Sequence, residues 1–454
     1  MNAPGMKPPP RSLRSLPPEG RVSAFGRPSA TDMNSTQVLT ARQGFLYGLL
    51  GLPLAFVALP LYVILPNHYA REFGVPLATL GLVLLAARLL DAFIDPLIGR
   101  WCDRLFARSI HAVLMFGACA ALLLSAGFAL LFFPLAHGPM ALAAWAGLLL
   151  VFTYSAYSAL SVAHQCWGAM LGGDEARRSR VVAWREGLGL VGVVLASVTP
   201  LVLGLAATVV VFWTALLAGW LAWTRSIRPE PLRLQRAGNI WLPFSRPGFR
   251  RLLGVFMING IASAIPATLV LFFVQDRLQA PKQFESVFLG LYFVAAAVSI
   301  PLWLRVVARF GLTRSWLFGM LLSVAAFSWA ALLNDGQLAA FGMVCVMSGL
   351  ALGTDLALPG AMLAGVIASA GDRGHAEGAY FGWWNFATKL NLALAAGLAL
   401  PLLGLFGYSP GARDAAALNA LTVAYCLLPC ALKLGALSAL YLLVIRPGQN
   451  WSTQ

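Results

Sequence analysis

From Gly44 onward, this chain of 454 residues consists of long apolar runs separated by short polar breaks. The runs have roughly 20 residues or more, which is the length that a helix needs to cross ~30 Å of hydrocarbon. In lipid every backbone polar group must be satisfied internally, so such runs cross a membrane as helices. The sequence therefore predicts an all-α, polytopic membrane protein.

Twelve runs meet this description, and we predict one membrane-spanning helix in each. Their approximate ranges are 43–67, 78–101, 110–134, 140–168, 181–204, 206–226, 250–275, 284–304, 315–333, 337–368, 379–405 and 417–444. The polar linker 227–249 divides six predicted helices from six, which gives two halves, 43–226 and 250–446. We expect cytoplasmic tails at 1–42 and 447–454, the first disordered because it is rich in Pro, Ser and Arg.

Only 11% of the residues are charged and the net charge is +15, which excludes an ordinary soluble domain. Arginines cluster after the second, fourth, sixth and eighth predicted helices, so both termini are predicted to be cytoplasmic. This distribution indicates contact with membrane lipid and not with nucleic acid. We expect a monomeric, multi-pass protein of the cell (plasma or inner) membrane.

Ionisable residues inside the apolar runs are the candidates for function, because burying a charge in a bilayer is costly. Asp91 and Asp95 lie four residues apart in the second predicted helix, with Arg88 three residues earlier, so all three share a face. Two such carboxylates can hold a small cation such as Na⁺, or share a proton. The alternative is a structural ion-pair cluster with Arg88 that only locks helices together.

Lys389 lies near the middle of the eleventh predicted helix, too deep for its ammonium to reach the membrane surface easily. We expect it to approach Asp91 or Asp95 and to tune their affinity for a cation. The alternative is a packing bridge with Asp355 in the tenth helix. Lys433 in the twelfth helix has no evident partner, and we interpret it as structural.

Polar and aromatic side chains converge near the middle of several predicted helices, which suits a solute with hydroxyl groups. A hydrogen-bonded core position is the alternative for His164, and interfacial packing is the alternative for the pair Trp383 and Trp384. The expected solute contacts are Tyr157, His164, Gln165, Trp167, Arg185, Trp384 and Asn385.

Enzyme motifs are missing from the sequence. There is no G-x-S-x-G, no H-E-x-x-H and no P-loop, and the six cysteines form no disulfide or metal pattern. We therefore do not expect an enzyme, a cofactor or a transition-metal site.

Several stretches resemble known transporters. ARLLDAFIDP at 87–96 is similar to the helix-two motif R-x-x-D-A-x-x-D-P of the glycoside-pentoside-hexuronide:cation symporters, the melibiose permease group of the major facilitator superfamily. GTDLALPGAM at 353–362 and GAYFGWWNFATKL at 378–390 resemble its helices ten and eleven. GRWCDR at 99–104 resembles the G-x-x-x-D-R/K loop of the superfamily, which makes Asp103 and Arg104 part of a predicted cytoplasmic gate loop.

The resemblance implies two six-helix halves, a cation site at Asp91 and Asp95 beside Lys389, and Na⁺- or H⁺-coupled symport of a small organic solute. The acidic residues that sugar-transporting members place in helices one and four are replaced here by GLPLA at 51–55 and by His164 and Gln165. Of the sugar-contacting residues only Arg185 has a match. In the first interpretation, the solute is therefore a sugar or glycoside. In the second, the protein transports an amphiphile or lipid-like molecule, or is an exporter. In the third, it is a membrane scaffold or sensor that transports nothing.

Overall fold

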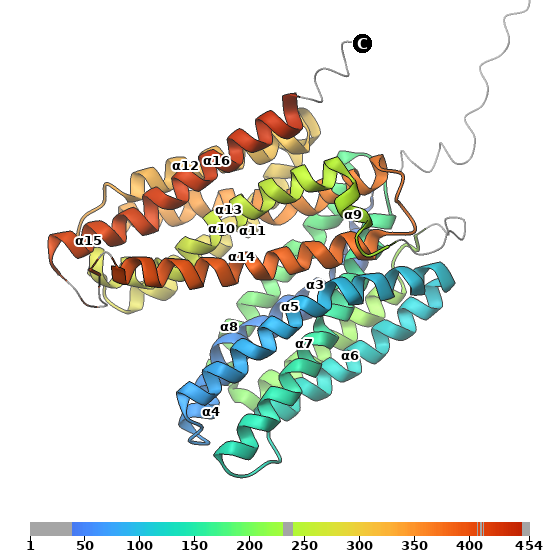
Figure 1. The fold of residues 1–454 in the computed structure, drawn as a ribbon, viewed down its shortest axis with the longest axis horizontal. Helices are drawn as coiled ribbons and strands as arrows, with labels where there is room; N and C mark the ends of the chain where they lie inside the picture. Colours follow the sequence, from blue (N-terminus) through green and yellow to red (C-terminus); the bar gives the residue numbers. More distant parts are fainter. Residues whose placement is uncertain (1–38, 230–238, 406, 409–410, 412, 447–454) are drawn as a thin grey trace, which may run out of the picture. The chain divides into compact units, whose positions relative to one another are not determined.

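The computed structural model describes residues 39–229, 239–405, 407–408, 411 and 413–446. Every regular element in these ranges is helical, which confirms the predicted all-α fold (Figure 1). The first elements are α2 (Ala41–Gly48), α3 (Gly51–Leu59), η1 (Pro60–Ile64), α4 (Leu65–Arg71), α5 (Leu77–Arg108), α6 (Ile110–Phe132), α7 (Pro139–Met170) and α8 (Glu175–Thr224). The later ones are α9 (Leu242–Ser245), α10 (Pro247–Phe272), η2 (Phe273–Arg277), α11 (Gln283–Phe310), α12 (Leu312–Ala330), α13 (Leu338–Ser369), α14 (Glu377–Leu405), α15 (Ala415–Thr422), η3 (Val423–Leu427), α16 (Leu428–Leu440) and η4 (Tyr441–Ile445).

Each predicted span coincides with helix in the structure. The first span is built from α2, α3, η1 and α4, and the last from α15, η3, α16 and η4. The fifth and sixth spans join in α8, where Gly204 adopts a φ of 80° and breaks the helix at the predicted boundary. Among the described residues, nine segments are long and apolar enough to cross a membrane, and α5, α12 and α14 correspond to the remaining predicted spans.

The helix α5 is longer than the sequence predicts. The expected gate loop at 99–104 is helical, because α5 continues to Arg108 and only Ser109 separates it from α6. The hydroxyl of Ser109 accepts the backbone N–H of Ala112 over 3.1 Å and so caps α6. The loop prediction for Asp103 and Arg104 is therefore wrong, and both residues lie on the last turns of a helix.

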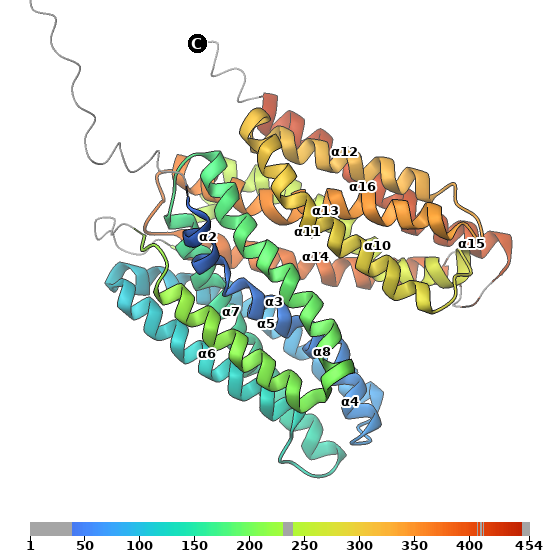
Figure 2. The ribbon, with the colours of Figure 1, turned by 180° about the vertical axis from the view of Figure 1, so that it is seen from behind.

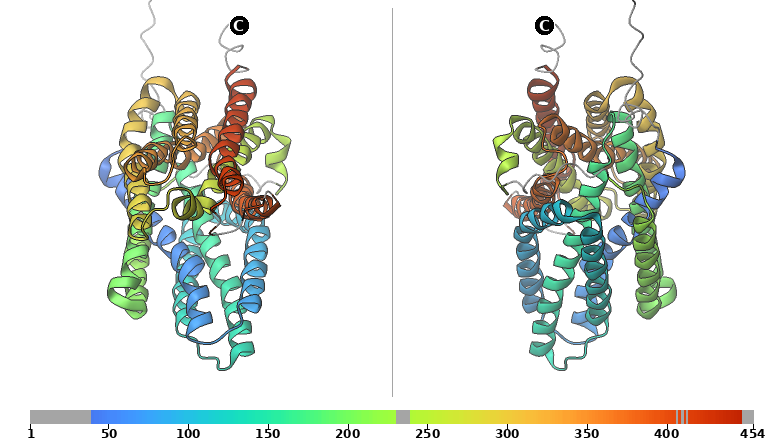
Figure 3. Two further views of the ribbon diagram at one scale, coloured as in Figure 1. Left: turned by 90° about the vertical axis from the view of Figure 1, so that its left-hand side faces the viewer. Right: turned by 90° about the vertical axis from the view of Figure 1, so that its right-hand side faces the viewer.

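Within each half, neighbouring helices pack side by side. In the N-terminal half α5 and α6 both pack against α7, and α3 packs along α8 (Figure 2). In the C-terminal half α10 contacts α14 and α16, while α13 contacts α11 and α12. Figure 3 shows the same groups, with residues of the N-terminal half in blue to green and those of the C-terminal half in yellow to red.

Glycines allow α5 of the first half to approach α14 of the second. A Cβ atom added to Gly99 would collide with the backbone carbonyl of Gly378, and one added to Gly382 would lie 2.7 Å from the carbonyl oxygen of Asp95. Small residues at a helix crossing let two backbones come this close. The crossing brings Asp95 next to α14, on which Lys389 lies two turns beyond Gly382.

Further contacts join the halves at one end of the helices, which we call the basic end. It carries the connections at 109, 171–174, 311 and 370–376, and it is the end predicted to be cytoplasmic. The carboxylate of Glu175 accepts the backbone N–H of Leu312 over 2.8 Å. The guanidinium of Arg373 donates to the carbonyl of Met170, also over 2.8 Å.

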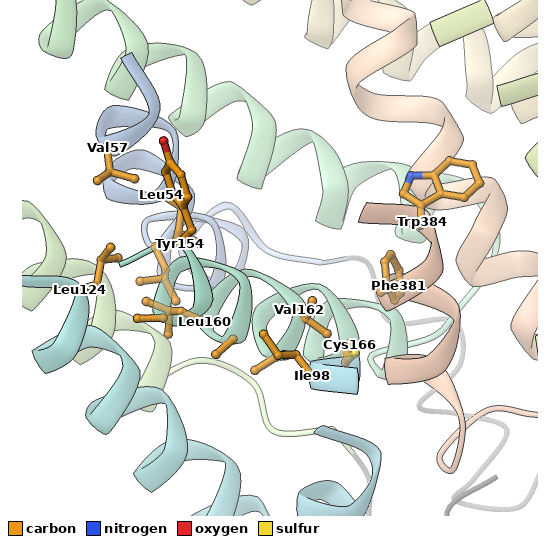
Figure 4. Close-up of a cluster of buried hydrophobic side chains, with 14 of the residues drawn as sticks. Leu54, Val57, Ile98, Leu124, Tyr154, Leu160, Val162, Cys166, Phe381 and Trp384 are labelled. Carbon is orange, nitrogen blue, oxygen red and sulfur yellow. The ribbon is translucent and has the colours of Figure 1, made fainter. Parts of the chain in front are cut away.

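Apolar side chains from both halves form one buried cluster. Leu160 and Cys166 of α7 and Ile98 of α5 are buried in it, together with Phe381 and Trp384 of α14 (Figure 4). Lipid tails are as apolar as these side chains, so in the bilayer close van der Waals contact, and not the hydrophobic effect, holds such helices together. The cluster therefore supports the polar groups that lie beside it.

Candidate functional site

The structure brings Asp91, Asp95 and Lys389 together, as the sequence predicts. The ammonium of Lys389 lies 2.7 Å from Oδ2 of Asp91 and 2.7 Å from Oδ2 of Asp95. The side chain of Asp95 is 0% exposed and that of Asp91 is 4% exposed, whereas that of Lys389 is 20% exposed. Two buried carboxylates thus share one ammonium, and the three side chains carry a net charge of one negative unit when all are ionised.

Ser158 of α7 completes this arrangement. Its hydroxyl donates to Oδ1 of Asp91 over 3.0 Å and accepts from the ammonium of Lys389 over 2.9 Å. All three N–H groups of the ammonium therefore face oxygen atoms. Ser158 is not among the residues predicted from the sequence, although a hydroxyl next to Tyr157 in an apolar helix is a weak indication of a polar contact.

Asp95 is less satisfied than Asp91. Its Oδ2 lies against the ammonium of Lys389, but its Oδ1 receives no hydrogen bond from the described residues. A buried carboxylate oxygen without a donor is costly unless it is neutralised. Asp95 is therefore the member of the group with the most to gain from a bound cation or proton.

Arg88 does not take the position that the sequence suggested. Its guanidinium lies over the ring of Tyr62, 4.4 Å from the centroid, and no ion pair among the described residues joins it to Asp91 or Asp95. The interpretation of Arg88 as their structural partner is wrong, because a cation–π contact orients its guanidinium towards Tyr62.

Asp355 also has a different partner from the one considered. Lys433, for which the sequence offered none, donates to Oδ2 of Asp355 over 3.0 Å and to Oδ1 of Asn259 over 2.9 Å. Three further groups donate to the same carboxylate, those of Asn259, Ser263 and Trp316. The alternative of a bridge between Lys389 and Asp355 is therefore wrong, and Asp355 has four donors for its lone pairs.

Two of the predicted solute contacts lie in the core. His164 is 0% exposed, its Nε2 lies 2.8 Å from the carbonyl oxygen of Tyr47, and its ring stacks on Tyr47. Trp167 is also 0% exposed and donates to the carbonyl of Ile227 over 2.9 Å. Both side chains are buried against protein, although Nδ1 of His164 has no hydrogen-bond partner among the described residues. The structure therefore favours the core interpretation of His164 and corrects the prediction for Trp167.

Arg185 and Gln165 line a small cavity between the two halves. The cavity has a volume of about 10 Å³ and lies between α7, α8, α13 and α14. Such a volume holds about one water molecule. The guanidinium of Arg185 forms an ion pair with Glu186, and the amide of Gln165 donates to Ser161 over 3.0 Å.

Of the other predicted solute contacts, one is packed against protein and two are partly exposed. The ring of Trp384 stacks on Phe256 with the centroids 3.9 Å apart and is 6% exposed, as the packing interpretation expects. Tyr157 and Asn385 are half-buried, and Asn385 lies one turn before Lys389 on α14. Asn385 is thus the nearest of these residues in sequence to the ammonium that holds Asp91 and Asp95.

Asp103 connects the halves at the basic end. Its buried carboxylate accepts the backbone N–H groups of Gly378 and Ala379 in the first turn of α14. Glu377, which precedes them, is 0% exposed, and burial raises the pKa of its carboxyl to about 7. Burial also raises the pKa of the Asp103 carboxyl well above its usual range. Arg104 is exposed.

A family model described as MFS/sugar transport protein matches residues 45–446. No curated protein sequence matches the chain. The matched range includes every helix of the candidate site.

Several solved structures share the fold. A bacterial homologue of the iron transporter ferroportin, in the outward-facing state with soaked iron, has a TM-score of 0.67 and 14% identity over 89% of this chain and 99% of that chain. A variant of the E. coli fucose:proton symporter FucP has a TM-score of 0.64 and 15% identity over 88% and 99%. The human organic anion transporter MFSD10 (TETRAN) has a TM-score of 0.63 and 17% identity over 88% and 100%.

Proposed function

Because this chain belongs to the MFS/sugar transport protein family, we propose that it is a symporter in which Na⁺ or H⁺ drives the uptake of a small organic solute. Membership makes it a multi-pass membrane protein of the major facilitator superfamily, a secondary transporter and not an enzyme. The coupling ion, the solute and the location in the cell's plasma or inner membrane are parts of the proposal.

The shared ammonium of Lys389 is the observation that supports this function best. Two buried carboxylates contact it at 2.7 Å, so one negative charge in the group has no counter-charge. An uncompensated charge in a low-dielectric site is costly, and a single Na⁺ or H⁺ would remove it. We therefore assign the coupling ion to Asp91 and Asp95, with Ser158 as an additional oxygen and Lys389 as the group that tunes the affinity.

The position of these residues also explains how ion binding would be linked to movement. Asp91 and Asp95 belong to α5 of the first half, and Lys389 belongs to α14 of the second. In transporters built from two repeats, the halves rock about a site at their interface. A cation that changes the contacts between Asp95 and Lys389 changes the free-energy difference between the two arrangements of the halves, which is the condition for coupling.

We assign the chain to the melibiose permease group within the superfamily on the stretches at 87–96, 353–362 and 378–390. The solute in this proposal is a sugar, a glycoside or another small organic molecule, contacted by Arg185, Gln165, Tyr157 and Asn385. A single chain contains both halves of the site, so we propose a monomer without a cofactor other than the coupling ion.

Two steps test the function. A thermal-shift screen of the purified protein against solutes, each with and without Na⁺ and at two pH values, identifies a ligand whose stabilisation grows with the cation. Uptake of that ligand is then measured in proteoliposomes with an imposed Na⁺ or proton gradient. Asp95→Asn should abolish the cation dependence, whereas the same change at the exposed Asp335 should leave it intact. Unchanged Na⁺ and pH dependence in Asp95→Asn protein would refute the assignment.

A further inference from the structure

Two buried carboxylates, those of Asp103 and Glu377, meet at the N-terminus of α14. Asp103 of α5 accepts two backbone N–H groups there, those of Gly378 and Ala379. Glu377 is 0% exposed, and its Oε1 accepts the backbone N–H of Gly374 over 2.6 Å. Its Oε2 is buried and has no hydrogen-bond partner among the described residues. A helix N-terminus provides only about half a positive charge, which is too little for two carboxylates.

The side chains around Glu377 do not supply the missing positive charge. Glu377 faces Asp103 of α5, the thiol of Cys166 of α7 and the guanidinium of Arg373. Arg373 donates to the carbonyl of Met170 over 2.8 Å. Within the part of the chain that the structure describes, no ion pair includes Glu377 or Asp103. A buried carboxylate without a counter-charge is costly, and a proton removes that cost.

The hydrogen bonds decide which of the two carboxyls takes the proton. Burial raises the pKa of the Asp103 carboxyl and a charge on Glu377 raises it further, so one of the two is neutral. Asp103 accepts two N–H groups and lies near the guanidinium of Arg100, and both favour its charged form. Glu377 has the oxygen without a donor. The negative charge therefore stays on Asp103, and Glu377 is the neutral group.

We propose that Glu377 is a proton site of the closed basic end, which binds a proton when α14 packs against α5 and releases it when this end opens. The residues that exclude water from it belong to the other half of the chain. Gly99 and Asp103 of α5 pack against Gly378, and Cys166 lies on α7. Movement of α14 away from these helices therefore hydrates the carboxyl of Glu377.

This site is separate from the proposed coupling site at Asp91 and Asp95. Glu377 lies in the first turn of α14, at the basic end, and its proton exchanges with the solution at that end when the halves separate there. The proton is not carried across the membrane. It changes the free-energy difference between the closed and the open basic end, whichever ion and solute the protein transports.

The sign of the pH effect follows from the two environments of the carboxyl. Burial raises the pKa of Glu377 to about 7 in the closed arrangement, against ~4.3 for a hydrated glutamate. The closed arrangement binds the proton more tightly, so acid favours closure, and opening becomes easier as the pH rises between these two values. From about pH 6 to about pH 8, the ratio of open to closed protein should rise about tenfold.

Spin labels on the two halves measure this ratio. The labels are attached through His111→Cys in α6 and Ser369→Cys in α13, both exposed at the basic end, in a chain whose six native cysteines are replaced by alanine. Electron–electron distance measurements on the full chain in lipid nanodiscs, without solute, give the populations of short and long distances. The long distances should gain about tenfold between about pH 6 and about pH 8, and Glu377→Gln should remove this change.

Three further variants, each made in the labelled chain, test whether the effect belongs to Glu377. Glu72→Gln makes the same change at a carboxylate that is 64% exposed at the other end of the helices, and it should keep the full pH dependence. Glu377→Asp keeps a carboxyl in the first turn of α14 and should keep the sign of the dependence. Asp95→Asn removes a carboxylate of the coupling site and should also leave the dependence in place.

Three results would overturn the proposal. The first is a ratio of open to closed protein that does not change with pH when Glu377 is present. The second is the same pH dependence in Glu377→Gln protein as in the chain with Glu377, or, if that variant does not fold, a dependence of opposite sign in Glu377→Asp protein. The third is a dependence that Asp95→Asn removes, because the proton would then act at the coupling site.

Discussion

Asp103 of α5 accepts the backbone N–H of Ala379 in α14 over 2.9 Å, across the boundary between the two halves. The N-terminus of a helix has unsatisfied N–H groups and a partial positive charge, so a carboxylate there acts as a cap from another part of the chain. In this structure the contact closes the basic end, and opening of that end requires that it break.

Asp103→Asn should therefore loosen the basic end. An amide offers one acceptor where the carboxylate offers two, and loss of a cap costs ~1 kcal/mol, or about fivefold in an opening equilibrium. The neighbouring Cys102 is buried and Cys119 is exposed. Alkylation of Cys102 by N-ethylmaleimide should accelerate in the variant by about that factor, with Cys119 as the reference.

Arg104→Gln is the matched control, since Arg104 is adjacent and exposed. It should leave the alkylation rate of Cys102 unchanged. An Asp103→Asn protein in which Cys102 reacts as slowly as in wild type would show that the cap does not hold this end closed.

Glu377 should make the stability of the protein depend on pH. Burial raises the pKa of its carboxyl to about 7, against ~4.3 in an unfolded chain. Because the pKa is higher in the folded protein, the neutral carboxyl contributes to the free energy of unfolding. This contribution is complete below the pKa of the unfolded chain and is lost as the pH rises through about 7. Glu377→Gln stays neutral, so its melting temperature should equal that of wild type at about pH 4.5 and exceed it by a few degrees above pH 8.

The measurement is a pair of melting curves at each pH. The other titrating groups are common to both proteins, so their effects cancel in the difference between the two melting temperatures. The glutamine keeps an oxygen for the backbone N–H of Gly374, which Glu377 accepts in the structure. A constant difference across the pH range would mean that Glu377 titrates outside it.

The glycines at the crossing of α5 and α14 should be sensitive to a single added methyl group. Gly99→Ala places a Cβ against the carbonyl of Gly378, so the helices must separate at a cost of ~1 to 3 kcal/mol. We expect a lower melting temperature and loss of transport. Gly81→Ala lies in the same helix with nothing within 4 Å of the new Cβ, and it should change neither. Full transport by Gly99→Ala protein would contradict a tight crossing.

The sequence predicted the helices well because a long apolar run has few other structures open to it in lipid. It also predicted that Lys389 would meet Asp91 or Asp95, since opposite charges at this depth must pair. It did not predict the partner of Lys433, because the pair with Asp355 depends on how helices far apart in sequence face each other. The local spacing of Arg88 and Asp91 likewise said nothing about the ring of Tyr62.

The solute contacts were less predictable for a related reason. A polar residue in an apolar helix indicates that it needs a partner, but not whether the partner is a solute or the protein. His164 meets the carbonyl of Tyr47, and Trp167 meets that of Ile227. Ser158, which was not predicted from the sequence, contacts both Asp91 and Lys389. Which face of α7 turns towards α5 and α14 became visible only in the structure.

The pair of the buried Lys433 and the half-buried Asp355 should stabilise the C-terminal half without taking part in ion coupling. Lys433→Met leaves Asp355 ionised and without its ammonium, which costs ~3 to 5 kcal/mol when one partner of a buried pair is removed. Adding Asp355→Asn removes the remaining charge, while Asn259 and Trp316, which both donate to Oδ1, can still donate to the amide oxygen. The double variant should therefore regain a large part of the lost melting temperature and keep the Na⁺ or pH dependence of uptake. A double variant that folds and transports without any cation dependence would instead make Asp355 a second coupling site.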